Sequence, residues 1–161
     1  MTRSDGGAGA VAAGPAHGRE VRFPPRFLWG AATSSHQTEG GNRGNDWWSF
    51  EESGRLQYRS GDACQHYERF EHDFDLAAAG GHNAHRFSVE WSRVEPSEGR
   101  WSEEALDHYA RVVAALRERD IEPIVTLHHF TNPAWFAASG GWSRRDAPRR
   151  FARYVERVCA A

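Results

Sequence analysis

Residues 82–96 read HNAHRFSVEWSRVEP. Within this stretch, residues 83–89 (NAHRFSV) follow a pair of glycines and predict a short β-strand. The polar and aromatic residues Glu90 and Trp91 come directly after it, and a turn is predicted at residues 96–100. This stretch therefore predicts a strand with polar and aromatic residues directly after its carboxyl end.

Two further stretches have the same plan. Residues 27–33 (FLWGAAT) form a short apolar run closed by small residues, which predicts a buried parallel strand, and Gln37 follows it. Residues 121–127 (IEPIVTL) are rich in β-branched residues and are followed by the letters HHF. The sequence thus predicts three strands, each with polar or aromatic residues after its carboxyl end.

Helical spacing of apolar residues predicts a helix after each strand, over residues 62–79, 102–119 and 143–161. Asp62 is the expected N-cap of the first helix and Ser102 that of the second, and the glycines at 80 and 81 are expected to end the first. The expected core positions of the first helix are Tyr67, Phe70, Phe74 and Leu76.

The alternation of strand and helix predicts an α/β fold with a parallel sheet and right-handed crossovers. A doubly wound sheet and a (β/α)₈ barrel both fit this order. The first strand–helix turn has neither a Gly-x-Gly-x-x-Gly motif nor a Walker loop, so a nucleotide-binding sheet loses its main support. Polar residues gathered after the strands favour the barrel, in which sites lie at the carboxyl ends of the strands. The long polar stretch 34–61 is expected to be a functional loop.

Composition gives no indication of a nucleic-acid or membrane partner. The 161 residues carry a net charge of -2, and no run of about 18 apolar residues is present. All 20 basic residues are arginines, which we attribute to GC-rich coding rather than to phosphate binding. Cys64 and Cys159 lack the spacing of metal ligands and are expected to be free thiols of a cytoplasmic protein. Residues 1–22 are interpreted as a disordered Gly/Ala-rich leader and residues 23–161 as the folded part.

Three blocks resemble glycoside hydrolase family 1, the family of β-glucosidases. They are FPPRFLWGAATSSHQTEGG at residues 23–41, the block at 82–96, and EPIVTLHHFTNPAWF at 122–136. The third helix, GGWSRRDAPRRFARYVERV at 140–158, is also similar in style. The resemblance covers the chain from Phe23 onward and implies the first three or so units of a (β/α)₈ TIM barrel.

The resemblance further implies a retaining β-glycosidase of carbohydrate metabolism that needs no cofactor or metal and acts on a small β-glycoside or oligosaccharide. Retention requires two carboxylates about 5–5.5 Å apart, one as nucleophile and one as acid/base. In the family these belong to a Glu-Asn-Gly motif and an Asn-Glu-Pro motif, neither of which occurs in this sequence. Both catalytic glutamates are therefore expected beyond Ala161.

Four residues match binding or supporting positions of the family. Gln37 and His129 match side chains that hold hydroxyl groups of the glycone, the sugar unit whose bond is cleaved. Phe130 stands where many members have tryptophan, so a hydrogen bond from an indole N–H is absent at this position. Arg86 matches an arginine that keeps the nucleophile ionised, because an adjacent guanidinium lowers a carboxylate pKa; an ordinary salt bridge is the alternative for this residue.

Other polar residues near the strand ends receive no catalytic role. His128 is expected to be structural, because adjacent residues of a strand point to opposite sides, and no third ligand with suitable spacing supports a metal site at this His pair. Glu39 and Glu90 are not matched to either catalytic glutamate.

Two other hypotheses stay open for the chain as given. It could be a truncated and inactive product, because three barrel units alone expose a sheet edge and apolar faces. It could instead be a weak sugar-binding pseudoenzyme. The preferred sugar, the aglycone and the oligomeric state do not follow from the sequence.

Overall fold

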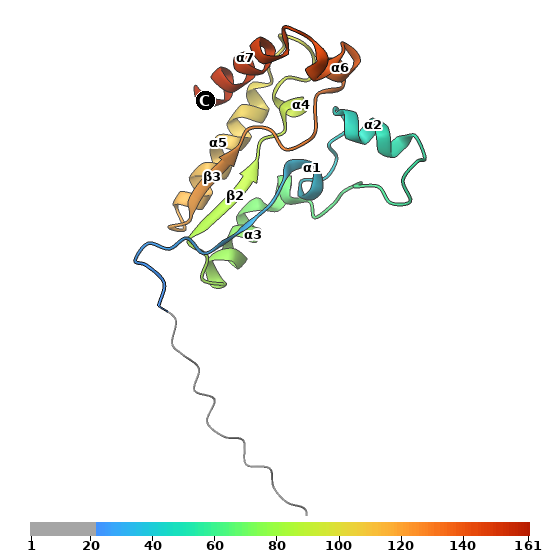
Figure 1. Ribbon diagram of the computed structural model, residues 1–161. Helices are drawn as coiled ribbons and strands as arrows, with labels where there is room; N and C mark the ends of the chain where they lie inside the picture. Colours follow the sequence, from blue (N-terminus) through green and yellow to red (C-terminus); the bar gives the residue numbers. More distant parts are fainter. Residues whose placement is uncertain (1–21) are drawn as a thin grey trace, which may run out of the picture.

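The computed structural model describes residues 22–161, and the expected leader lies outside the described residues except for Arg22. Strands and helices alternate along the chain, as predicted (Figure 1). The strands are β1 (Gly30–Ala32), β2 (Ala84–Ser88) and β3 (Glu122–Thr126), and the helices are α1 (Ser35–Thr38), α2 (Asp46–Glu52), α3 (His66–Ala79), α4 (Trp91–Val94), α5 (Glu103–Arg117), α6 (Ala134–Ala138), a 3₁₀ turn (Gly141–Ser143) and α7 (Ala147–Cys159).

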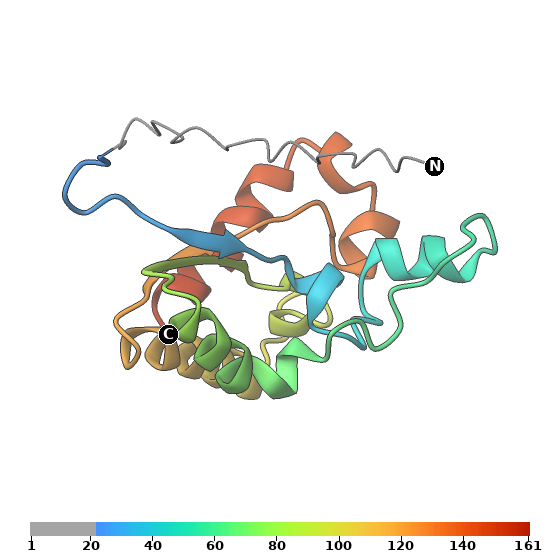
Figure 2. The same ribbon diagram turned by 90° about the horizontal axis from the view of Figure 1, so that it is seen from below.

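The three strands form one parallel sheet in the order β1-β2-β3, with Gly30 opposite Ala84 and Ala84 opposite Glu122. Figure 2 shows α3 and α5 side by side on the same face of this sheet. This is the arrangement of consecutive strand–helix units in a barrel, where all helices cover the outer face. The predicted parallel α/β fold is therefore present.

The core lies between the sheet and the helices, and aromatic rings fill much of it. Phe74 on α3 and Leu116 on α5 are completely buried. At the other end of the sheet, the indole ring of Trp91 stacks on the ring of Tyr154 with centroids 5.0 Å apart, which ties α4 to α7. Burial of such large rings is the main stabilising contribution that these helices receive.

Four predictions about local structure were wrong. Strand β1 is exposed rather than buried, because it lies at an edge of the sheet and pairs on one side only. Asp62 is not the N-cap of α3; Gln65 takes that place in a left-handed conformation. Leu76 is 60% exposed and does not belong to the core. The last helix begins at Ala147, four residues later than expected, after the 3₁₀ turn.

The stretch 34–61 is also more ordered than predicted, because it contains α1 and α2. Helix α2 begins where the side chain of Asn45 accepts a 2.8 Å hydrogen bond from the backbone N–H of Trp48. By contrast, the predicted cap of α5 is confirmed, since Ser102 Oγ accepts from the N–H of Ala105. No helix among residues 22–161 is both long and apolar enough to cross a membrane.

Candidate functional site

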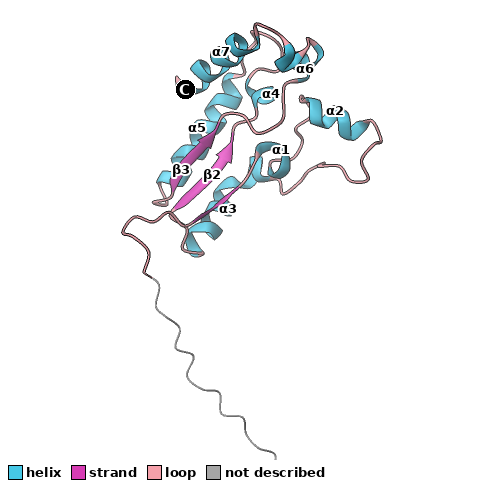
Figure 3. Cartoon of the chain, viewed as in Figure 1, coloured by secondary structure: helices cyan, strands magenta, loops and turns pink. Residues whose placement is uncertain are grey.

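The polar residues singled out in the sequence lie at one end of the sheet. Figure 3 shows the strand arrows pointing toward the end where the short helices α1, α2, α4 and α6 are gathered. Gln37 belongs to α1, which follows β1, while His129 and Phe130 follow β3. Arg86 lies inside β2, between them in the sheet. The structure therefore places all four residues on neighbouring strand–loop units.

Gln37 is exposed, and its side chain is free to bind a ligand through the amide nitrogen. Its Oε1 accepts a 2.6 Å hydrogen bond from Ser34 Oγ. The amide nitrogen has no acceptor within residues 22–161, so both of its N–H groups are available to an oxygen such as a sugar hydroxyl. The hydrogen bond from Ser34 fixes which end of the amide faces outward.

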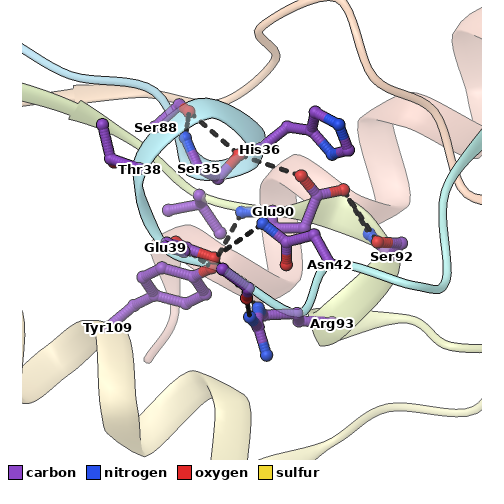
Figure 4. A network of polar contacts seen from close by, with 12 residues as sticks. Ser35, His36, Thr38, Glu39, Asn42, Ser88, Glu90, Ser92, Arg93 and Tyr109 are labelled. Atoms are coloured by element: carbon purple, nitrogen blue, oxygen red, sulfur yellow. Dashed lines mark hydrogen bonds and ion pairs between the residues drawn. The ribbon is translucent and has the colours of Figure 1, made fainter. Parts of the chain in front are cut away.

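Helix α1 is too short to be stable alone, and buried contacts hold it in place (Figure 4). The backbone N–H of Ser35 donates to Ser88 Oγ at 2.7 Å, and its hydroxyl donates to Glu90 Oε2 at 2.9 Å. The second contact joins α1 to the residue that follows β2. Gln37 is thereby carried on a segment fixed to the central strand of the sheet.

A second set of contacts fixes α1 to α2. The imidazole of His36 contacts Glu51 Oε1 through Nε2 at 2.9 Å and Asn45 Nδ2 through Nδ1 at 3.0 Å. Because Asn45 Oδ1 already accepts a hydrogen bond from the backbone N–H of Trp48, the remaining amide nitrogen, Nδ2, must donate to Nδ1 of His36. The proton of the imidazole is then on Nε2 and is donated to Glu51. Burial alone raises the pKa of Glu51, but hydrogen bonds from His36 and Ser60 outweigh this effect, so its pKa is lowered.

His129 is half-buried and has a lowered pKa. Burial disfavours the imidazolium form, and the positive charge of Arg86 disfavours it further. A neutral imidazole has one N–H donor and one acceptor nitrogen, which suits a sugar hydroxyl. His128 is directed elsewhere: its Nε2 contacts Asn132 Oδ1 at 3.2 Å, and its ring meets that of Trp142 edge to face.

Phe130 is exposed and adopts a left-handed backbone conformation with φ of 54°, which is uncommon for an aromatic residue. Its ring meets the ring of Trp47, on α2, edge to face at 5.4 Å. Trp47 was not predicted as a site residue, because this region was predicted to be a loop and not a helix. The exposed pair of aromatic rings is the kind of surface on which a pyranose ring can pack.

Arg86 Nη1 donates a 2.6 Å hydrogen bond to the backbone carbonyl of Thr33, just after β1. Within residues 22–161 it forms no ion pair with a carboxylate, so the alternative of an ordinary salt bridge does not hold for the described part of the chain. Its positive charge contributes to the lowered pKa of His129. The guanidinium thus lies in the site as a positive charge without an acidic partner in the part of the protein described.

The two carboxylates that follow β1 and β2, Glu39 and Glu90, are both buried and bonded. Glu39 is 4% exposed and accepts from Arg93 Nε at 2.9 Å and from Tyr109 Oη at 2.8 Å. Burial raises the pKa of Glu39 to about 7, and the guanidinium of Arg93 offsets only part of that rise. Glu90 is 0% exposed. Since neither carboxylate reaches the surface, neither is placed to contact a substrate.

The described residues contain no group of three or more His, Cys, Asp or Glu side chains arranged to hold a metal ion. Cys64 and Cys159 are exposed free thiols, as expected. The chemistry that the site offers is therefore hydrogen bonding by an amide and a neutral imidazole, an aromatic surface, and one guanidinium charge.

Comparison with solved structures identifies the architecture. The chain superposes on the β-glycosidase of Pyrococcus horikoshii with a TM-score of 0.81 and 49% sequence identity, covering 84% of this chain and 32% of that one. For the family 1 β-glucosidase of Thermotoga maritima the TM-score is 0.78 and the identity 35%, with 82% and 32% covered. These likenesses confirm the predicted TIM barrel, of which the described residues form three consecutive units.

Sequence comparison agrees. The chain is 36% identical over 144 residues to a 1,4-beta-D-glucan glucohydrolase of Thermotoga neapolitana, covering 83% of this chain and 33% of the relative. It is 39% identical over 154 residues to thermostable beta-glucosidase B of Thermobispora bispora, covering 91% and 32%. The chain thus spans about a third of the length of the curated relatives that it matches. The family model for glycosyl hydrolase family 1 matches residues 19–161, and the chain belongs to this family.

Proposed function

We propose that this chain supplies the glycone-binding part of a retaining β-glycosidase. The observation that carries the proposal is the position of Gln37 and His129 after the carboxyl ends of β1 and β3, the two parallel strands on either side of β2; one offers free N–H donors and the other a neutral imidazole. Together they offer the mixture of donors and acceptors that sugar hydroxyls require. Arg86 would face the nucleophile and keep it ionised.

Family relatives support a β-glycoside as the substrate class. Solved structures of the Thermotoga maritima β-glucosidase hold castanospermine and cyclophellitol. The relatives are not uniform, since one is a 6-phospho-beta-glucosidase and another a bifunctional beta-D-glucosidase/beta-D-fucosidase. We therefore propose a β-glycoside with a glucose-like glycone and leave the substituents of the sugar open.

The test begins with the coding DNA directly downstream of the codon for Ala161. An in-frame Asn-Glu-Pro motif followed by a Glu-Asn-Gly motif would supply the two carboxylates, and the complete gene product should then hydrolyse p-nitrophenyl β-D-glucoside. A native gene without these motifs, or a complete product that hydrolyses neither p-nitrophenyl β-D-glucoside nor its 6-phosphorylated and β-D-fucoside counterparts, would refute the proposal.

A matched pair of variants tests the role of Gln37. Gln37→Ala in the complete gene product should lower kcat/KM about 10–100-fold, because it removes hydrogen bonds to the glycone. The control is Gln57→Ala, which changes an exposed glutamine that makes no hydrogen bond within the described residues. Equal kcat/KM values for the two variants would exclude Gln37 from the site.

A second candidate function is sugar binding without hydrolysis. It is favoured by the burial of Glu39 and Glu90, the two carboxylates that lie after β1 and β2. Titration of the 161-residue chain with D-glucose or cellobiose, monitored by NMR, tests the sugar binding that both candidates share, and hydrolysis by the native gene product distinguishes them. Binding that Gln37→Ala abolishes, in a native protein without hydrolysis, would establish this second function.

A further inference from the structure

Glu90 is a buried carboxylate that joins three parts of the chain. It follows β2, and its side chain caps α4. Its Oε2 accepts a hydrogen bond from Ser35 Oγ at 2.9 Å, and its Oε1 accepts one from Ser92 Oγ at 2.7 Å (Figure 4). The same Oε2 also accepts from Thr131 Oγ1 at 3.0 Å. One oxygen atom therefore bonds two segments that are far apart in the sequence.

The two segments bonded to Oε2 are those that carry the proposed sugar-binding residues. Ser35 lies two residues before Gln37 on α1, and Thr131 lies two residues after His129. We propose that Glu90 is a positioning residue that holds Gln37 and His129 in a fixed relation to each other. This inference rests on the proposed function, because it assigns the way in which that site keeps its geometry.

The directions of the hydrogen bonds require a carboxylate at position 90. Ser88 Oγ accepts from the backbone N–H of Ser35 and donates to Ser35 Oγ, so the hydroxyl of Ser35 must donate onward to Glu90. On the other side, the backbone N–H of Ser92 points at Oε1 at 3.4 Å and can only donate. All the groups that converge on Glu90 are thus arranged as donors, and an ionised carboxylate accepts from all of them.

A glutamine at this position would meet donors on both sides. If its amide nitrogen faced Ser92, it would oppose the backbone N–H; if it faced Ser35, it would oppose a hydroxyl whose proton is already directed inward. Glu90→Gln keeps the shape of the side chain but must lose at least one of these contacts. The change therefore loosens the connection between the two segments without removing buried volume.

Glu95 provides a matched control. It is also 0% exposed, and its carboxylate accepts from Trp91 Nε1 at 2.8 Å and from the N–H of Gly99 at 2.7 Å. These partners belong to α4 and to the turn after it, not to the segments of Gln37 or His129. Glu95→Gln therefore imposes a comparable loss inside the core without touching the proposed connection.

The first experiment uses the 161-residue chain and needs no activity. In ¹H–¹⁵N spectra, Glu90→Gln should shift the side-chain amide signal of Gln37 and the backbone signal of His129, whereas Glu95→Gln should leave both in place. Unmoved Gln37 and His129 signals in Glu90→Gln would overturn the proposal, and so would equal shifts in the two variants.

The second experiment uses the complete gene product and p-nitrophenyl β-D-glucoside. Glu90→Gln should raise KM about tenfold, the effect expected when hydrogen bonds to a charged group are lost, and Glu95→Gln should change KM less than about twofold. A residue that served stability alone would lower the melting temperature in both variants and leave both KM values unchanged, which would contradict the proposal.

A double-mutant cycle covers the case in which Glu90→Gln does not fold. Ser35→Ala and Thr131→Val each remove one donor to Oε2 and leave Glu90 in place. Both substitutions act through the same oxygen, so their effects on KM should not multiply. The rise in KM in the double variant should be smaller than the product of the two single effects by a factor of about three or more. Effects that multiply would show that the segments are independent and would refute the inference.

The failure of this inference and that of the proposed function are distinguishable. If the complete gene product hydrolyses no β-glycoside, the proposed function fails, while the spectra of the chain still report whether Glu90 sets the relation between Gln37 and His129. If hydrolysis is present but Glu90→Gln behaves like Glu95→Gln, only the inference about Glu90 fails.

Discussion

The hydroxyl group of Tyr109, on α5, donates a 2.8 Å hydrogen bond to Oε1 of Glu39, which lies 70 residues earlier in the chain. The same hydroxyl accepts the backbone N–H of Glu90 at 3.0 Å. A helix on the outer face of the sheet is therefore bonded to the segments that follow β1 and β2. The geometry of the candidate site depends on how α5 is seated, although α5 carries none of the site residues.

The pH dependence of stability should show the buried charge of Glu39. Its pKa is about 7 in the folded chain, above the ordinary value of 4.5, because burial disfavours the ionised form. The folded state therefore binds the proton more tightly than the unfolded state. The contribution of Glu39 protonation to the free energy of unfolding is therefore fully present below about pH 4.5 and is lost as the pH rises toward 7.

Glu39→Gln removes this titration and should gain stability over the parent chain as the pH rises from about 4.5 to 7. The relative gain should be on the order of 1–3 kcal/mol, measured by urea unfolding at several pH values. Below pH 4.5 both side chains are uncharged, so that range provides the internal reference. Parallel stability curves across the whole range would show that Glu39 ionises without cost.

His108 should act in the opposite direction. Its ring stacks on the ring of Tyr67 at 3.6 Å, and burial, followed by the positive charges of Arg111 and Arg93, lowers its pKa to about 4. The folded state therefore favours the neutral imidazole, a stabilising contribution that is present above about pH 6.5 and is lost as the pH falls toward 4.

His108→Phe keeps an aromatic ring against Tyr67 and removes the titration. The variant should gain stability relative to the parent chain as the pH falls from about 6.5 to 4, as measured by thermal unfolding at fixed salt. At pH 8 both side chains are neutral, and the difference there reports packing alone. His85, whose pKa is also lowered to about 4, is unchanged in both proteins, so its effect cancels. A difference that does not vary with pH would contradict the expectation.

The long elements of the fold could be predicted from sequence because each follows a local rule. Strand β3 is β-branched, and α5 has both a periodic apolar face and a serine cap that forms as expected. Helices α1, α2 and α4 could not be predicted in this way. At four to seven residues they are too short to show a period, and contacts with distant parts of the chain, such as Ser35 with Glu90, stabilise them.

The candidate site divides in the same way. Gln37, His129 and Phe130 could be named because they stand in family motifs beside predicted strands. Trp47 could not, since its proximity to Phe130 depends on α2 and on the contact of His36 with Glu51. Nor could the role of Glu90, because its partners Ser35 and Thr131 are 55 and 41 residues away in the sequence. Small hydroxyl residues give no sequence signal that would pair them.

The difference between Phe74 and Leu76 should be visible in stability. Both lie on α3, but Phe74 is completely buried and Leu76 is 60% exposed. Phe74→Ala should lower the free energy of unfolding by about 3–5 kcal/mol, because it leaves a cavity between α3 and the sheet. Leu76→Ala should stay within about 0.5 kcal/mol. Chemical denaturation measures both, and a similar loss for the two variants would place α3 in a different rotation about its axis.

Gly30 should tolerate no side chain, because the backbone of β2 leaves no room for one at this position. A Cβ atom at position 30 would lie 1.9 Å from the backbone oxygen of Ala84, its partner in the parallel register. Neither backbone can withdraw without separating the strands. Gly30→Ala should therefore lower the free energy of unfolding by about 2–4 kcal/mol. It should also increase amide hydrogen exchange at Thr33, whose backbone N–H donates to the carbonyl of Arg86.

Gly44→Ala is the matched control for Gly30→Ala. A Cβ atom at position 44 would come no closer than 3.4 Å to its nearest neighbour, an atom of the Ser92 side chain. This variant should keep both its stability and its exchange pattern, since such a distance is ordinary van der Waals contact. Because β1 leads directly into α1, only Gly30→Ala should also displace Gln37 and weaken sugar binding. If Gly30→Ala had the same stability and amide exchange as Gly44→Ala, the close pairing of β1 with β2 would be wrong, and the position of Gln37 at the same end of the sheet as His129 would lose its support.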